Sequence, residues 1–177
     1  IRLAQADTPS LVIAAWRLVL ASLVLAPIAL VGHRAELRGL TRREWASLLV
    51  AGLLLALHFV AWITSLAYTS VAASVVLVSS NPLFVGLASH LLLRERLTRG
   101  MVVALLIASS GSVLIGLGDL RRGVHWLWGD ALALVGAMAA AGYFLIGRRL
   151  RARLSLLAYV FPVYGTAAVT AMTVMLL

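Results

Sequence analysis

Between Trp45 and Leu93 the chain reads WASLLVAGLLLALHFVAWITSLAYTSVAASVVLVSSNPLFVGLASHLLL, and none of these residues is charged. A helix needs about 20 apolar residues to cross a bilayer, so this stretch has room for two crossings. The Ala-Tyr-Thr-Ser segment at 67–70 supplies the turn that we expect to divide them. The bilayer is therefore the expected solvent of this chain.

The composition of the whole chain agrees with a membrane location. Hydrophobic residues make up 63% of it, charged residues 12%, and the mean hydropathy is +1.04. Soluble domains are about a quarter charged. Every backbone N–H and C=O must be satisfied inside lipid, and the apolar segments lack the alternation of a β-barrel. We therefore predict an all-α, polytopic bundle of transmembrane helices.

Charge positions divide the chain into six apolar spans, each long enough to cross a hydrocarbon core of about 30 Å. The spans are expected at Thr8–Val31, Trp45–Leu66, Ser70–Leu93, Gly100–Leu117, Gly129–Gly147 and Leu154–Leu177.

The arginines are distributed unevenly between the two sides that six crossings define. One side receives the segments 32–44, 94–99 and 148–153, which hold eleven Arg and three Glu. The other side carries three Arg and three Asp. Cations in short loops stay in the cytoplasm, so these three segments are expected to be cytoplasmic and the protein to lie in the inner (plasma) membrane. Topology and contact with anionic lipid account for the net charge of +9, which leaves no reason to expect nucleic acid as a partner.

Two segments of the chain resemble each other weakly. PSLVIAAWR at 9–17 aligns with LSLLAYVFP at 154–162, and five crossings separate the copies, so they enter the membrane from opposite sides. Inverted repeats of this kind are typical of transporters, whose sites lie near the midplane between repeats. The chain has no initiating Met and ends in an apolar run, so we expect a fragment of a longer protein.

The sequence also resembles EamA-type members of the drug/metabolite transporter superfamily. The matching elements are Trp16-Arg17, LAYTS at 66–70, Pro82, RERLT at 94–98, the glycines 111, 116 and 118, and GDALALVGAMAAAGYFLIGRRL at 129–150.

The resemblance implies ten helices in two inverted halves of five, around a central substrate cavity. Residues 1–118 would then be the first repeat without most of its first helix, 119–128 an extracytoplasmic loop, and 129–177 the start of the second repeat. The implied function is transport, often export, of small organic metabolites such as amino acids, nucleobases or drugs, by alternating access. The alternative is a non-transporting helix bundle that serves as a scaffold or assembly partner. The expected partners are the lipid bilayer and a small organic solute, with a homodimer left open.

Arg17 is the most informative polar residue inside a span. It lies roughly 13 Å into the first span, where a guanidinium is costly unless it faces an interior or a wet cavity. One interpretation is a clamp for a substrate carboxylate, because the guanidinium donates bidentately. The other is a structural Arg bonded to helix carbonyls, or one that snorkels to the outer interface.

His58, Trp62 and Ser65 share one helix face, because they are spaced i, i+4, i+7. An imidazole near mid-depth can bond a substrate or take a proton, and the indole offers a stacking surface for a flat substrate. The alternatives are an interhelical hydrogen bond for His58 and an interface anchor for Trp62.

Ser79 and Asn81 lie at the centre of the third span, beside Pro82. Because Pro82 has no N–H for the Val78 carbonyl, we expect a kink there. The freed carbonyl and the Asn81 amide would then face a ligand, whereas close helix packing is the rival explanation for the serines.

Other residues are expected to be structural. Glu95 is predicted to form an ion pair or helix-end cap, Gly111 to serve packing, and Pro162 to kink the last span. Asp130, at the edge of the span 129–147, is counted with the charges of the outer side, and no carboxylate is expected inside a span. There are no Cys residues, paired carboxylates or metal-ligand spacing, so neither an enzyme nor a cofactor or metal site is predicted.

Overall fold

The computed structural model describes residues 8–120 and 123–176, which are almost entirely helical and contain no β-strand. The helices are α1 (Ser10–Gly32), α2 (Arg34–Arg38), α3 (Arg42–Tyr68), α4 (Val71–Val78), α5 (Asn81–Leu93), α6 (Arg99–Leu120), α7 (Val124–Leu150) and α8 (Leu156–Leu176). By length and hydropathy, six segments qualify as membrane spans, with α4 and α5 together forming one of them. The predicted all-α bundle with six spans is confirmed.

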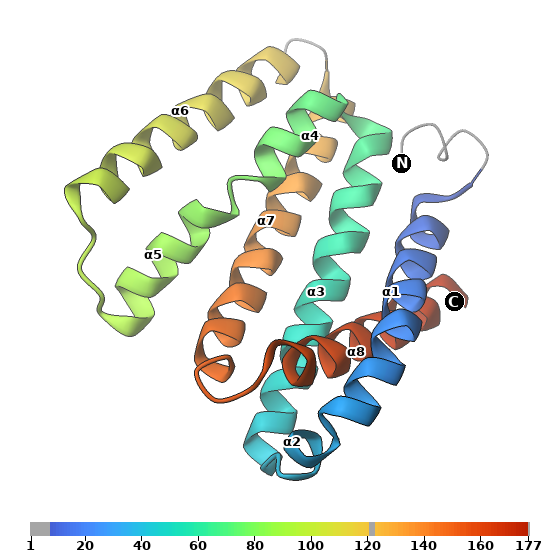
Figure 1. Ribbon diagram of the computed structural model, residues 1–177. Coiled ribbons are helices and arrows are strands. Elements are labelled where there is room, and N and C mark those ends of the chain that lie inside the picture. Colours follow the sequence, from blue (N-terminus) through green and yellow to red (C-terminus); the bar gives the residue numbers. More distant parts are fainter. Residues whose placement is uncertain (1–7, 121–122, 177) are drawn as a thin grey trace.

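The helices are arranged around a central pair formed by α3 and α7 (Figure 1). On one side, α1 packs against α8, and α8 packs in turn against α3. On the other side, α4 and α5 both contact α7, and α6 lies at the periphery (Figure 1).

Small residues on α7 allow it to approach α3 closely. The ridge formed by Ala133, Ala137 and Ala141 is buried. At Gly129 an added Cβ would lie only 2.7 Å from the Thr69 Cβ. Without hydrophobic driving force between helices in lipid, such close van der Waals contact is a main source of their association.

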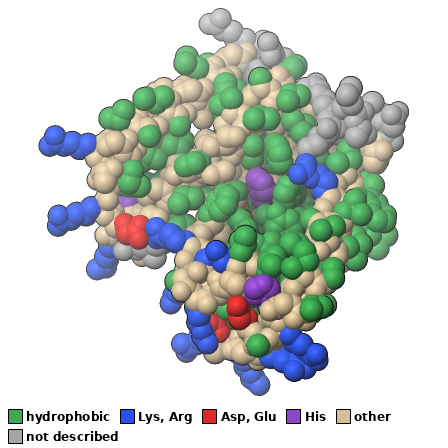
Figure 2. Space-filling model, in the orientation of Figure 1, with side chains coloured by type: hydrophobic (Ala, Val, Ile, Leu, Met, Phe, Trp, Pro, Cys, Tyr) green, Lys and Arg blue, Asp and Glu red, His purple; other side chains and the backbone are tan. Residues whose placement is uncertain are grey.

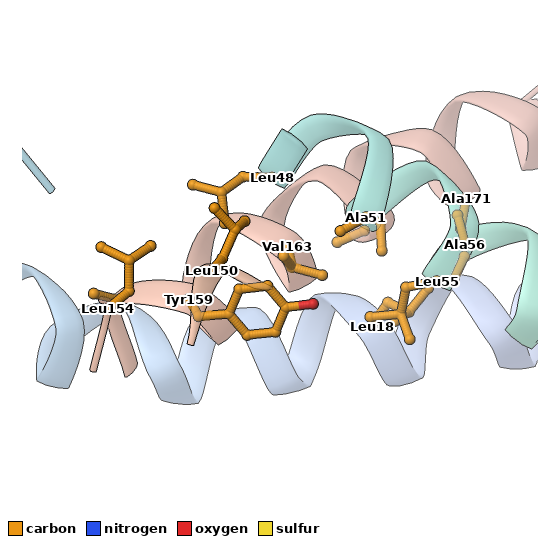
Figure 3. Close-up of a cluster of buried hydrophobic side chains, with 14 residues drawn as sticks. Leu18, Leu48, Ala51, Leu55, Ala56, Leu150, Leu154, Tyr159, Val163 and Ala171 are labelled. Carbon is orange, nitrogen blue, oxygen red and sulfur yellow. The ribbon is translucent and has the colours of Figure 1, made fainter. Parts of the chain in front are cut away.

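A second core joins α1, α3 and α8 (Figure 3). Leu18, Leu48 and Val163 are at most 1% exposed and come from three different helices. Pro162 is buried inside α8, which continues as one helix through it. The Pro162 carbonyl accepts a hydrogen bond from the Thr166 hydroxyl at 2.9 Å.

The third span is interrupted where Pro82 predicts a kink. The helix ends at Val78 and restarts at Asn81, with Pro82 in the first turn of α5. The Ser80 hydroxyl donates to the Leu77 carbonyl at 2.6 Å, and the Asn81 amide donates to the Val78 carbonyl at 3.4 Å. Local side chains thus satisfy the backbone groups that the interruption releases.

The loop expected at 119–128 is shorter than predicted. Helix α6 extends to Leu120 and α7 begins at Val124, so most of this segment is helical; residues 121 and 122 are not described. The charged residues at 119–122 and 130 suggested a loop between them, whereas no proline interrupts the chain between Gly123 and the apolar part of α7.

The Arg-rich segments gather at one end of the bundle. Glu95 forms a bidentate pair with Arg148, at 2.9 and 3.1 Å, which joins the α5–α6 connection to α7. Arg153 pairs with Glu44 at 2.6 Å, which joins the α7–α8 connection to the start of α3. Figure 2 shows the cations along the lower and left margins of this face. This common end is what the predicted topology requires.

Helix α6 has no buried side chain among its described residues. An added Cβ at Gly111 would meet nothing within 4 Å, so its predicted packing role has no contact partner in the described part of the chain.

Candidate functional site

Arg17 lies against an aromatic group on α3. Its Cζ atom is 5.3 Å from the ring centroid of Phe59, within cation–π distance. Phe59 contacts His58 edge-on, with ring centroids 5.0 Å apart, and His58 stacks on Trp62 at 5.8 Å. These four residues form a continuous group, here called the Arg17 cluster. Arg17 itself is exposed in the described structure, so its guanidinium donors are open to a ligand or to another part of the protein.

His58 joins α3 to α7. Its Nδ1 lies 2.9 Å from the Gly136 carbonyl oxygen, which can only accept, so Nδ1 carries the proton of this bond. In a neutral ring Nε2 is then the accepting nitrogen. The interhelical hydrogen bond that the sequence left open is therefore present, and it fixes the orientation of the ring beside Trp62 and Phe59.

Trp62 and Ser65 differ in their surroundings despite their common helix face. The Trp62 Nε1 is buried and has no hydrogen-bond partner among the described residues. Ser65 is fully buried, donates to the Trp62 carbonyl at 2.7 Å and lies 2.7 Å from the Ser74 hydroxyl. Ser65 thus contacts α4, while Trp62 keeps an unused donor next to His58.

Ser79 and Asn81 lie at the interruption between α4 and α5. Ser79 and Pro82 line a cavity of about 270 Å³ between α5 and α6, whose other walls are largely apolar. In the described structure no hydrogen bond or ring contact joins Ser79 or Asn81 to the Arg17 cluster. The predicted binding residues therefore form two groups: one on α1 and α3, the other at the α4–α5 interruption.

Asp130 is a buried carboxylate that we expected among the charges of the outer side. It is 6% exposed, lies inside α7, and its Oδ1 accepts a hydrogen bond of 3.0 Å from the Thr69 hydroxyl. The expectation that no carboxylate lies inside a span is wrong at this position. No proline lies between Gly123 and Asp130, but Gly129 directly precedes the carboxylate, so the sequence did not mark this earlier helix start.

No group of three or more His, Cys, Asp or Glu that could hold a metal occurs in residues 8–120 and 123–176. The Arg17 cluster itself offers positive charge, hydrogen-bond donors and aromatic surfaces.

Residues 1–117 match the EamA-like transporter family. The chain belongs to the EamA-like transporter family. An "Uncharacterized transporter" of Archaeoglobus fulgidus is 36% identical over 83 residues, which cover 47% of this chain and 29% of that protein. The "Uncharacterized transporter YetK" of Bacillus subtilis is 30% identical over 94 residues, 51% of this chain and 28% of that protein.

This EamA-like chain therefore aligns with under a third of each of these two relatives. No solved structure matches it. The family assignment and the six spans show a multi-pass membrane protein.

Proposed function

We propose that the full-length protein exports small organic metabolites, such as amino acids, nucleobases or drugs, by alternating access at a midplane cavity. Membership of the EamA-like transporter family supports transport as the activity, and transporters are not enzymes. Within this chain, the Arg17 cluster is the observation that supports the proposal most directly.

The cluster supplies the contacts that a small organic solute needs. Arg17 offers a planar set of donors for a carboxylate, and its position above Phe59 holds the guanidinium without using those donors. The Phe59 ring adds an apolar surface, and the Trp62 indole packs beside it with ring centroids 6.3 Å apart and its N–H buried. Together they suit a flat or amphipathic solute with an acidic group.

The arrangement of α1 and α8 supports the inverted repeat. The connections that follow α1 and precede α8 meet at the same end, where the Ser155 N–H donates to Glu36 at 2.9 Å and the Ser155 hydroxyl lies 2.8 Å from His33 Nδ1. The two helices therefore run in opposite senses, as copies related by an inverted repeat do.

Flux of labelled amino acids and nucleobases through the full-length protein in vesicles tests the proposal. A bidentate charged hydrogen bond contributes about 1.5–3 kcal/mol, so Arg17→Lys should lower flux of a carboxylate substrate roughly 10- to 100-fold. Arg38→Lys, at the exposed end of α2, is the matched control and should transport like the wild type.

Two results would contradict the proposal at different levels. Equal flux for Arg17→Lys and the wild type would contradict the role of Arg17 as a carboxylate clamp but not the proposal of transport. Absence of flux for every solute tested, with the protein folded in the vesicles, would favour the scaffold alternative.

A further inference from the structure

The Arg-rich end of the bundle carries two grooves that meet on α7. One, of about 470 Å³, lies between α3 and α7 and is lined by Arg43, Arg149 and Arg153 together with Ile146 and Leu150. The other, of about 640 Å³, lies between α5 and α7 and has Ala88, Leu92 and Leu145 among its walls. Ile146 and Arg149 line both grooves.

The cations in these grooves differ in whether an acidic residue already neutralises them. Arg148 is paired with Glu95, and Arg153 is paired with Glu44. Arg43 and Arg149 have no ion pair or side-chain hydrogen bond within residues 8–120 and 123–176. Both are exposed, and both line the α3–α7 groove, Arg43 from α3 and Arg149 from α7.

The charge of the α3–α7 groove favours an anion. Its titratable lining consists of three arginines and one carboxylate, Glu44, which is already bonded to Arg153 and to Thr41. Thr41 and Ser47 complete the polar rim. A phosphodiester placed between Arg43 and Arg149 would find charge-assisted donors on two sides, which is how arginine recognises phosphate.

The apolar part of the lining favours a lipid over a free anion. Beside the cations, the walls include Ile146 and Leu150 and, in the neighbouring groove, Leu92 and Leu145. Cationic and apolar walls in one groove suit the headgroup and the acyl chain of a phospholipid. Basic pockets between transmembrane helices on the cytoplasmic side bind anionic headgroups for the same reason.

We propose that the α3–α7 groove is a binding site for an anionic phospholipid, with the phosphodiester held by Arg43 and Arg149 and an acyl chain lying along Ile146. This site is distinct from the Arg17 cluster and does not depend on the transported solute. The lipid would contact both α3 and α7 at the Arg-rich end of the bundle.

Binding of phosphatidylglycerol to the full-length protein tests the site. The measurements are thermal unfolding in detergent with added phosphatidylglycerol or phosphatidylcholine, and counting of retained lipids by native mass spectrometry. The double variant Arg43→Gln, Arg149→Gln is compared with the double variant Arg38→Gln, Arg96→Gln, whose arginines lie outside both grooves at the same end.

We expect phosphatidylglycerol, and not phosphatidylcholine, to stabilise the wild type and the control. The groove variant should bind phosphatidylglycerol roughly thirtyfold more weakly, because two cations are removed from the headgroup site. Its unfolding temperature in phosphatidylcholine should equal that of the control, which separates lost binding from misfolding.

Three results would overturn the proposal. The first is equal retention of phosphatidylglycerol by the groove and control variants. The second is stabilisation of the wild type by inorganic phosphate or glycerol phosphate to the same extent as by the lipid, which would assign the groove to a free anion. The third is equal stabilisation by phosphatidylcholine.

Discussion

Gly52 lies where α3 meets α8, and the residue is glycine because no side chain fits there. A Cβ at this position would lie 2.5 Å from the Thr166 Cβ and 2.8 Å from the Val163 carbonyl oxygen. Alanine in a helix interior normally gains roughly 0.5–1 kcal/mol over glycine. Here overpacking, at about 1–3 kcal/mol, outweighs that gain, so Gly52→Ala should lower the unfolding temperature of the purified protein in detergent.

Gly111→Ala is the matched control for this prediction. Gly111 is also a helical glycine, on α6, but an added Cβ there meets nothing within 4 Å. Its unfolding temperature should stay unchanged or rise. If the two alanine variants were equally stable, the close contact between α3 and α8 would not exist in the folded protein.

For individual residues, the sequence predicts neighbours on one helix but not the partners on other helices. The spacing of His58 and Trp62 correctly placed them together, and the structure stacks the two rings. The partner of His58 is a backbone carbonyl, at Gly136, far away in the sequence. Every residue carries such a carbonyl, so only the packing of α3 on α7 selects one. The roles of these residues in binding stay predictions.

At the scale of elements, α2 and the start of α8 are held together by a carboxylate. The pKa of Glu36 lies below its ordinary value of 4.5, first because the Ser155 N–H donates to it and then because of the Ser155 hydroxyl and His33. Partial desolvation opposes these effects. A lowered pKa means that the folded state favours the ionised carboxylate, so this stabilisation is present above pH 4.5 and is lost as the pH falls through the folded-state value.

We therefore expect the wild type to lose stability progressively below about pH 4.5, and Glu36→Gln to lose less over the same range. Thermal unfolding at a series of pH values measures both. Glu95→Gln serves as the control, because it leaves the Ser155–Glu36 bonds in place and should retain the Glu36 part of the acid dependence. Parallel pH profiles for Glu36→Gln and the wild type would show that this contact does not form.

The helices themselves were predictable because charged residues marked their ends. All six spans appear, and the third is interrupted at the predicted kink beside Pro82. What the sequence did not predict is that α7 begins at Val124 and takes Asp130 into its buried part. A carboxylate next to a glycine resembles a loop, and only the contact with Thr69 shows that the site is interior.

The two ends of the bundle differ in charge, because the Arg-rich segments lie together at one end. The segments 32–44, 94–99 and 148–153 are joined to one another by the pairs of Glu95 with Arg148 and of Glu44 with Arg153. These exposed pairs contribute only about 0–1 kcal/mol each, so they do not hold the bundle together. The ion pairs are informative about topology, because they can form only if all three segments lie on one side of the bilayer.

Cysteine labelling tests this polarity directly, since the chain contains no native Cys. We expect the single variants Arg38→Cys, Arg96→Cys and Arg151→Cys to react with a membrane-impermeant maleimide in inside-out vesicles. None of them should react in intact spheroplasts, because short Arg-rich segments stay cytoplasmic. Val124→Cys, at the exposed start of α7, should give the opposite pattern. Labelling of any one of these three positions in intact spheroplasts would show that the three segments do not lie on one side of the membrane. It would thereby also contradict the antiparallel relation of α1 and α8, on which the inverted repeat depends.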